Sequence, residues 1–321
     1  MKIAFYGRNA ANFREGFEAL VGAGHEIVTL SDALDQPGEA AHFESAEVIV
    51  GNKLGAAEPT PRALKLYQAP AAGTDAIDPA RLPVGATLCN AFGHEQPIAE
   101  YVMTALLMRH VPMAAADAAL RKGKWDYWAG RPGALRTELG DQPIGLLGFG
   151  HIGKAIGVRA KAFGCRVVVA NRSKVPVGNG VDESYGLDQL PAFMGAADAI
   201  VVSLPLLDAT RGIVDAAALG AMRPHGVVIN VGRGPVIEEK ALFDALSNQR
   251  IGGAIIDTWY QYPTAEKPEV LPGNLPFETL SNVVLTPHMS GWTNGTVRRR
   301  QETVAENVRR LITGEALLNV V

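Results

Sequence analysis

The sequence has little of what marks several classes of protein. Its 321 residues include only two cysteines, Cys89 and Cys165. Both lie in apolar, strand-like surroundings, so we expect buried free thiols in a reducing cytoplasm and no metal site. No apolar run approaches the roughly 20 residues of a membrane-spanning helix. The apolar N-terminal stretch stops at Gly7, which predicts a strand rather than a signal peptide.

Charge of either sign is also sparse. Charged residues make up 20% of the chain and the formal net charge at pH 7 is −3. This balance indicates neither nucleic acid nor a membrane as a partner. Hydrophobic residues make up 47%, which excludes wholesale disorder. A chain of this length can form one large domain or two medium-sized domains.

Short apolar segments alternate with helical patterns, which is typical of parallel sheets covered by helices. The predicted strands of the first part are Lys2–Tyr6, Glu26–Leu30, Val48–Val50, Leu66–Gln68 and Thr87–Cys89. We predict a helix over Asn12–Val21, because its apolar residues share one face. A second, long helix is predicted from Pro97 toward Lys122, with the proline in its first turn.

A second set of strands begins at Ile144. Its further members are predicted at Ala199–Leu204, Gly226–Val231, Gly253–Asp257 and Val283–Leu285. The segment Thr293–Leu311 is again helical and ends near Gly314. We therefore predict two doubly wound α/β domains. Residues 97–288 form a nucleotide-binding domain inserted into a second domain, which comprises residues 1–96 and 289–321.

A glycine motif points to the ligand of the inserted domain. Gly148-x-Gly150-x-x-Gly153 follows an apolar run and precedes a helical pattern, and a strand-like segment, Arg166–Ala170, comes next. This order brings a helix N-terminus against a pyrophosphate. The first glycine permits the turn, the second lets phosphate approach the backbone, and the third lets helix and strand pack closely. The motif predicts dinucleotide binding.

The residues after the next strand indicate which dinucleotide. An NAD-selective site has Asp or Glu about 20 residues after the glycines, where it accepts hydrogen bonds from the ribose. This chain has Asn171-Arg172-Ser173-Lys174 there. Arg172 can bind a 2′-phosphate, which a carboxylate would repel, and Asn171 and Ser173 can donate hydrogen bonds to it. We predict NADP(H) as the cofactor, with NAD possible.

Three other strand ends carry reactive side chains. Arg233 stands between two glycines, where its planar fork can hold a carboxylate and orient a neighbouring carbonyl. His288 follows a proline and can donate a proton to a carbonyl oxygen as hydride arrives. Asp257 can accept a hydrogen bond from the nicotinamide amide or serve as a structural cap.

Several segments together carry a family resemblance. They are GLLGFGHIGKAIGVRAKAFG, DAIVVSLPLLDATRGIVDAAALGAMRPHGVVINVGRGPVIEEKAL, LTPHMSG and the terminal GEALLNVV. Over almost its full length the chain resembles the D-isomer-specific 2-hydroxyacid dehydrogenases. The resemblance implies two Rossmann-like domains with the active site between them, and a dimer built through the nucleotide-binding domain. The Asn-Arg-Ser sequence is similar to that of NADP-dependent glyoxylate/hydroxypyruvate reductases.

The resemblance also implies roles for individual residues. Arg233 would bind the substrate carboxylate and carbonyl, and His288 would be the acid/base. Backbone groups of two loops would bind the substrate carboxylate: Asn52, Lys53, Leu54 and Gly55, and Ala72, Gly73 and Thr74. The predicted cofactor site comprises Gly148, Gly150, His151, Ile152, Gly153, Asn171, Arg172, Ser173, Lys174, Ser203, Leu204, Pro205, Val231, Gly232, Asp257 and Gly291.

One departure from the family bears on the chemistry. Members usually pair the catalytic His with a Glu five residues after the strand-end Asp, and here that position is Tyr262. We therefore count Tyr262 among the catalytic residues, while Glu95, Glu266 and Glu269 are candidates for a substitute acid. The resemblance favours an NADP(H)-dependent reductase of a small 2-oxo acid. Two alternatives stay open: oxidation of a substrate that needs no acid/base pair, as formate does, and a nucleotide-sensing protein without catalysis.

Overall fold

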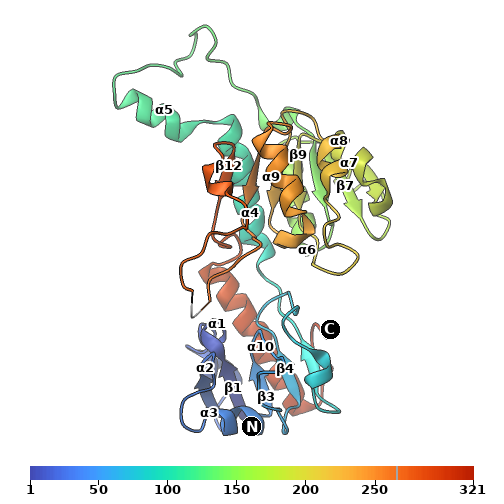
Figure 1. The fold of residues 1–321 in the computed structure, drawn as a ribbon. Helices are drawn as coiled ribbons and strands as arrows, with labels where there is room; N and C mark the ends of the chain where they lie inside the picture. Colours follow the sequence, from blue (N-terminus) through green and yellow to red (C-terminus); the bar gives the residue numbers. More distant parts are fainter. Residues whose placement is uncertain (265–266) are drawn as a thin grey trace. The chain divides into compact units, whose positions relative to one another are not determined.

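The computed structural model describes residues 1–264 and 267–321, which form two compact units (Figure 1). One unit comprises Met1–His94 and Trp292–Val321, and the other comprises Glu95–Gly291. The second unit is thus inserted in the sequence of the first, which contains both chain termini. These bounds lie a few residues from the predicted ones.

The first unit contains a sheet of five parallel strands in the order β2-β1-β3-β4-β5. The strands are β1 (Lys2–Tyr6), β2 (Glu26–Leu30), β3 (Val48–Val50), β4 (Leu66–Gln68) and β5 (Thr87–Cys89). All five coincide with the predicted segments. Strands β3 and β4 are buried at every position, as expected of parallel strands covered on both faces.

The helices of this unit are α1 (Gly7–Ala11), α2 (Phe17–Val21), α3 (Glu39–Ser45) and α10 (Asn294–Thr313), with a 3-10 turn at Pro79–Arg81. The prediction of one helix over Asn12–Val21 was wrong, because the chain turns between α1 and α2. Gly16 precedes α2 in the left-handed region, with φ of 75°, and this conformation interrupts a helix. The C-terminal helix α10 was predicted, and it ends at the left-handed Gly314.

The second unit contains a sheet of seven parallel strands in the order β12-β11-β10-β9-β6-β7-β8. The strands are β6 (Ile144–Leu147), β7 (Val167–Asn171), β8 (Glu183–Gly186), β9 (Ala199–Val202), β10 (Val227–Asn230), β11 (Gly253–Ile256) and β12 (Val283–Leu285). Six were predicted within about two residues. The edge strand β8 was not, since no residue of it is fully buried and its pattern is not apolar.

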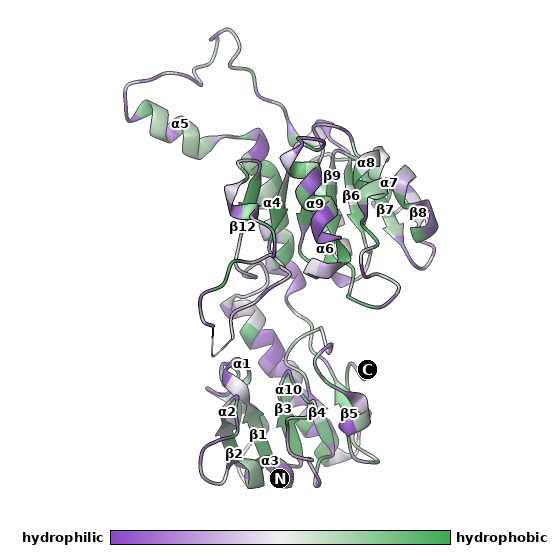
Figure 2. Ribbon diagram, in the orientation of Figure 1, coloured by the Kyte–Doolittle hydropathy of each residue, from purple (hydrophilic) through white to green (hydrophobic). Residues whose placement is uncertain are grey.

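Two apolar layers enclose this sheet. Helices α4 (Glu95–His110) and α6 (His151–Ala162) pack on one layer, and α7 (Leu190–Ala196), α8 (Ala216–Ala221) and α9 (Glu239–Ser247) pack on the other. Short 3-10 turns lie at Leu139–Asp141, Leu187–Gln189, Gly234–Val236 and Phe277–Thr279. In Figure 2 the strands are coloured mainly as hydrophobic, which fits a sheet buried on both faces. Both units are therefore doubly wound α/β folds, as predicted.

The long helix predicted from Pro97 toward Lys122 is in fact two helices. Helix α4 ends at His110, and α5 (Met113–Leu120) follows. Pro112 lacks an N–H and disfavours helical geometry in the residue before it, so the helix stops there. Helix α5 and the loop after it extend away from the sheet of the same unit (Figure 1).

Both cysteines are buried and free, as the sequence predicted. Within the described ranges, no helix has the length and hydropathy needed to cross a bilayer.

Candidate active site

The predicted functional residues of the second unit follow strands at one edge of its sheet. All seven strands are parallel, so their carboxyl ends meet at this edge. The residues that follow them are Gly148–Gly153 after β6, the turn from Asn171 after β7, Ser203–Pro205 after β9, Val231–Arg233 after β10, Asp257 and Tyr262 after β11, and His288 and Gly291 after β12. The topology thus gathers these predicted residues of the unit on one edge.

The glycine loop after β6 has the geometry that a pyrophosphate requires. Gly148 has φ of 97°, and a Cβ on Gly153 would lie 2.3 Å from the carbonyl oxygen of Gly148. The backbone N–H groups of Gly150 and Ile152 at the start of α6 have no acceptor among the described residues. Such N–H groups at a helix N-terminus bind anions. The residues present therefore fit a bound dinucleotide.

The turn after β7 presents positive charge. Asn171 Oδ1 accepts a hydrogen bond from Phe149 N–H at 3.2 Å, and its Nδ2 donates to the carbonyl of Ser173 at 3.0 Å. This residue therefore joins the turn to the glycine loop instead of pointing only at a ligand. Arg172 and Lys174 are exposed and pair with no carboxylate in the described parts of the chain. Two cations beside the glycine loop favour an additional phosphate.

The loop that carries Arg233 is fixed by a buried amide. Asn230 is 1% exposed, its Oδ1 accepts from Gly232 N–H at 3.1 Å, and its Nδ2 donates to the carbonyl of Arg233 at 3.2 Å. The flanking Gly234 is required by close approach, since a Cβ there would lie 2.2 Å from the carbonyl oxygen of Trp259. The guanidinium is therefore presented from a rigid loop.

Tyr262 lies against His288, as the sequence predicted. The hydroxyl of Tyr262 is 3.0 Å from His288 Nδ1 and accepts a hydrogen bond from Trp259 N–H at 3.1 Å. Burial raises the pKa of the Tyr262 hydroxyl, so this partner of the imidazole is neutral. The phenol thus makes the contact to His288 Nδ1 that a Glu carboxylate at this position would otherwise make.

His288 has a strained backbone. Its φ of 56° lies in the left-handed region, which costs a residue with a Cβ about 1–3 kcal/mol. The side chain of Asp257, which is fully buried, offsets this cost. Its two oxygens accept from Met289 N–H and Ser290 N–H, each at 2.9 Å. Asp257 therefore caps this turn, which is the second of the two roles that the sequence left open for it.

In the first unit, the loop after β4 presents free backbone donors. The N–H groups of Ala72, Gly73 and Thr74 donate to no acceptor among the described residues. Asn90, at the end of β5, donates from Nδ2 to the carbonyl of Ala72 at 2.9 Å and so orients this loop. Consecutive free N–H groups bind anions such as a carboxylate.

The loop after β3 offers fewer donors than predicted. Leu54 N–H donates to the carbonyl of Ala76 at 2.9 Å, and Gly55 N–H donates to Glu58 at 2.6 Å. Glu58 also accepts from Lys53 Nζ at 2.8 Å. Of the four predicted donors, Asn52 N–H and Lys53 N–H lack an acceptor among the residues that the structure describes. The Leu54 and Gly55 amides are thus engaged within the protein.

Three of these supporting residues were not predicted: Glu58, Asn90 and Asn230. The last two have a signal in the sequence, since each is a polar residue directly at the end of an apolar strand. Glu58 has none, because its contacts depend on the loop between β3 and β4. Glu266, a candidate for a substitute acid, lies outside the described residues.

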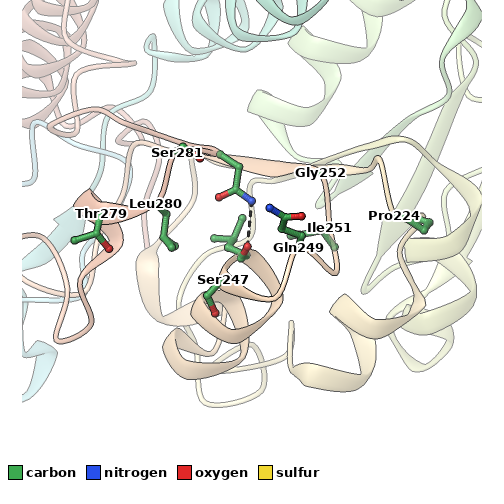
Figure 3. Close-up of a pocket in the computed structure, with 10 residues that line it drawn as sticks. Pro224, Ser247, Gln249, Ile251, Gly252, Thr279, Leu280 and Ser281 are labelled. Atoms are coloured by element: carbon green, nitrogen blue, oxygen red, sulfur yellow. Dashed lines mark hydrogen bonds between the residues drawn. The ribbon is translucent and has the colours of Figure 1, made fainter.

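A pocket at the opposite edge contains none of the predicted residues (Figure 3). It is lined by Pro224, Leu246, Ser247, Gln249, Ile251, Gly252, Thr279, Leu280, Ser281 and Asn282. Several of these residues precede β10, β11 and β12, so the pocket lies at the amino ends of the strands. Two of these residues are joined by the hydrogen bond from Asn282 Nδ2 to the carbonyl of Leu246, at 3.1 Å. No group of three or more His, Cys, Asp or Glu side chains within the described ranges could hold a metal ion.

The sequence matches a known family. Residues 102–290 match the NAD-binding domain of the D-isomer specific 2-hydroxyacid dehydrogenases, which is more than half of the chain. The chain belongs to this family. Its members are oxidoreductases, and the match covers the glycine loop, Arg233, Tyr262 and His288.

Individual relatives agree with this. A glyoxylate/hydroxypyruvate reductase A of Arabidopsis thaliana is 35% identical over 68% of this chain and 64% of its own length. A D-isomer specific 2-hydroxyacid dehydrogenase of Xanthobacter autotrophicus, solved with NADPH and MES, is 26% identical with a TM-score of 0.81, over 100% of this chain and 97% of that one. An NADPH-dependent glyoxylate/hydroxypyruvate reductase of Sinorhizobium meliloti, solved with NADP and sulfate, is 26% identical with a TM-score of 0.78, over the same shares.

Proposed function

We propose that this protein is an NADP(H)-dependent reductase of a small 2-oxo acid such as glyoxylate or hydroxypyruvate. The observation that carries the proposal is the Tyr262–His288 hydrogen bond at the same sheet edge as Arg233 and the glycine loop. An acid/base and a carboxylate-binding arginine beside a dinucleotide site are the groups that reduction of a 2-oxo acid needs. The names of the Arabidopsis and Sinorhizobium relatives support the substrate class.

The cofactor preference is supported by the turn after β7. Arg172 and Lys174 are exposed without a carboxylate partner among the described residues, so both are available to a 2′-phosphate. Gly150 and Ile152 would hold the pyrophosphate through their N–H groups. The Xanthobacter and Sinorhizobium proteins bind NADPH and NADP. When bound, the nicotinamide supplies the hydride.

The chain's own groups would do the remaining work. Arg233 would hold the substrate carboxylate and polarise the 2-oxo group by its fixed fork. In the first unit, the free N–H groups of Ala72–Thr74 are donors suited to a carboxylate. His288 would give its Nε2 proton to the carbonyl oxygen, and Tyr262 would hold the ring through Nδ1. In the reverse direction, neutral His288 would take the proton from the hydroxyl group.

The test is a panel of small 2-oxo acids assayed with NADPH and with NADH. We expect turnover of glyoxylate or hydroxypyruvate, faster at low cofactor concentration with NADPH. Absence of turnover with every 2-oxo acid, in protein that still binds NADPH, would contradict the proposal. Turnover of formate with NADP⁺ would instead indicate a dehydrogenase without proton transfer, the reading that Tyr262 in place of Glu favours.

We also propose that the protein forms a homodimer through the nucleotide-binding unit, in the cytoplasm, where its buried thiols stay reduced. The arm formed by α5 and the loop after it exposes large apolar side chains. Trp125 is 62% exposed, Trp128 60% and Met113 74%. Apolar side chains gathered on a projecting arm indicate a partner surface, and a second copy is the commonest partner.

Light scattering during size-exclusion chromatography tests this assembly. We expect twice the mass of one chain for the wild type and a shift toward one chain for Trp128→Glu. A wild type that elutes as a single chain at micromolar concentration would contradict the proposed dimer.

A further inference from the structure

The turn that carries His288 is fixed by three hydrogen bonds, and all three are accepted by the carboxylate of Asp257. Thr286 Oγ1 lies 2.6 Å from Asp257 Oδ1, and Met289 N–H and Ser290 N–H reach the same carboxylate at 2.9 Å each. The anchors stand before and after His288 in the sequence, so both sides of the left-handed residue are fixed.

A tyrosine from α4 extends this network. The hydroxyl of Tyr101 lies 2.7 Å from Thr286 Oγ1. Thr286 Oγ1 donates its one proton to Asp257 Oδ1, so Tyr101 donates to Thr286. Burial raises the pKa of Tyr101, which keeps this donor protonated. The resulting chain of bonds runs in one direction, from Tyr101 through Thr286 to Asp257.

A second contact fixes the orientation of Thr286. Its carbonyl accepts a hydrogen bond from Trp259 Nε1 at 2.8 Å, and Trp259 N–H donates to the hydroxyl of Tyr262. Trp259 therefore links the backbone of Thr286 to the phenol that contacts His288. The backbone and the ring of His288 therefore both depend on the hydrogen bonds made by Trp259, Thr286 and Asp257.

We propose that Tyr101 and Thr286 are positioning residues of the reaction, which hold the left-handed turn at His288 through Asp257. The inference rests on the proposed function, in which His288 is the acid/base. Neither residue touches the reacting atoms. Their loss would leave the glycine loop and the turn after β7 intact and misplace the imidazole, so the rate of reduction would fall more than the affinity for NADPH.

The primary experiment compares Thr286→Val with Thr286→Ser in the full-length protein. Valine keeps the shape and removes the hydroxyl, whereas serine keeps the hydroxyl. With NADPH and glyoxylate, we expect kcat to fall about 10- to 100-fold in Thr286→Val and less than about 3-fold in Thr286→Ser. The Kd of NADPH should change less than about 2-fold in both. An equal loss in the two variants would overturn the proposal.

A double-mutant cycle tests the role of Tyr101. Because Tyr101 acts only through Thr286, Tyr101→Phe should lower kcat by about 3- to 10-fold alone and hardly at all in the Thr286→Val background. Losses that multiply fully in the double variant would overturn the role of Tyr101.

Two matched controls make the comparison sharp. Thr258 is next to Asp257 in the sequence, and its buried hydroxyl has no hydrogen-bond partner among the described residues. Thr258→Val removes this hydroxyl. Tyr185→Phe removes a hydroxyl that contacts Glu183 at the far strand β8. Both should retain wild-type kcat. A loss in Thr258→Val as large as in Thr286→Val would show a general packing effect and overturn the proposal.

Amide hydrogen exchange separates this inference from the proposed function. The N–H groups of Met289 and Ser290 should exchange faster in Thr286→Val than in the wild type or Thr258→Val, whether or not the protein reduces a 2-oxo acid. Unchanged exchange at these two amides in Thr286→Val would overturn the network. If the wild type shows no turnover but the two amides still exchange faster in Thr286→Val, only the proposed function is refuted.

Discussion

Two turns at the same sheet edge are built by different means. The glycine loop after β6 bends because Gly148 adopts a positive φ, and it packs closely because Gly153 has no side chain. The turn after β12 also has a positive φ, but at His288, and a buried carboxylate from the neighbouring strand end fixes it. The first turn is determined by its own residues, and the second by a partner far away in the sequence.

This difference follows from what each turn presents to a ligand. The glycine loop offers backbone N–H groups, so a side chain at its glycines would block the approach of a phosphate to the backbone. The His288 turn must present a side chain that carries a proton, so glycine cannot replace it. A non-glycine residue in this conformation is strained, and Asp257 supplies the hydrogen bonds that compensate.

The largest expected effect comes from adding one methyl group to the glycine loop. In Gly153→Ala the Cβ would lie 2.3 Å from the carbonyl oxygen of Gly148, and the backbone must shift. We expect NADPH affinity to fall by more than about 100-fold and stability by ~1–3 kcal/mol. Gly157→Ala is the matched control in the same helix, because its Cβ would meet Leu146 at an ordinary 3.5 Å. Calorimetric titration with NADPH checks both, and equal behaviour of the two would contradict the close-packing argument.

Next in size is the change of Arg233 to lysine. Lysine keeps the charge but not the planar fork, so substrate binding and rate should both suffer, with kcat/KM for glyoxylate about 100-fold lower. Arg166→Lys, at the amino end of β7, serves as a control for the loss of a guanidinium. The unfolding temperatures of both variants should match that of the wild type. A wild-type kcat/KM in Arg233→Lys would show that this arginine does not hold the carboxylate.

A smaller and more selective loss is expected for Arg172→Ala. This change removes a side chain from the turn after β7 and leaves the glycine loop intact. NADPH binding should weaken by on the order of 1–3 kcal/mol, the size of a charge-assisted hydrogen bond. NADH binding should barely change, which makes NADH the internal control. Equal losses for both cofactors, or a wild type that prefers NADH, would refute the assignment of the 2′-phosphate site.

The same contrast explains how much of the molecule the sequence predicts. All strands of the first unit were predicted to the residue, because short runs of mainly apolar residues are typical of parallel strands covered by helices. The glycine loop was predicted because its residues are themselves the signal. Glu58 was not, because its contacts depend on the folded loop between β3 and β4. The helix over Asn12–Val21 failed at Gly16, whose left-handed φ cannot be read from an apolar pattern.

The smallest expected effect concerns the partner of His288. Burial raises the pKa of Tyr262, so the wild-type partner is a neutral phenol. In Tyr262→Glu a carboxylate would stand near Nδ1, favour the imidazolium and raise the pKa of His288 relative to the wild type. Reduction needs the protonated ring, so its rate should fall off at a pH about one unit higher in the variant. Oxidation needs the neutral ring, so its plateau should also begin at higher pH.

The pH profiles of kcat/KM in both directions, measured with the same cofactor and substrates, check this prediction. Tyr262→Phe is the matched control, since it removes the hydroxyl that Trp259 N–H and His288 Nδ1 share. It should lower the rate without moving either limb upward, because a phenyl ring adds no charge. If the pH profiles of Tyr262→Glu do not shift, another carboxylate already sets the pKa of His288. Glu95, Glu266 and Glu269 are then the residues to replace next. An upward shift in Tyr262→Glu alone would show that the His288 turn, unlike the glycine loop, has its chemistry set by one replaceable side chain.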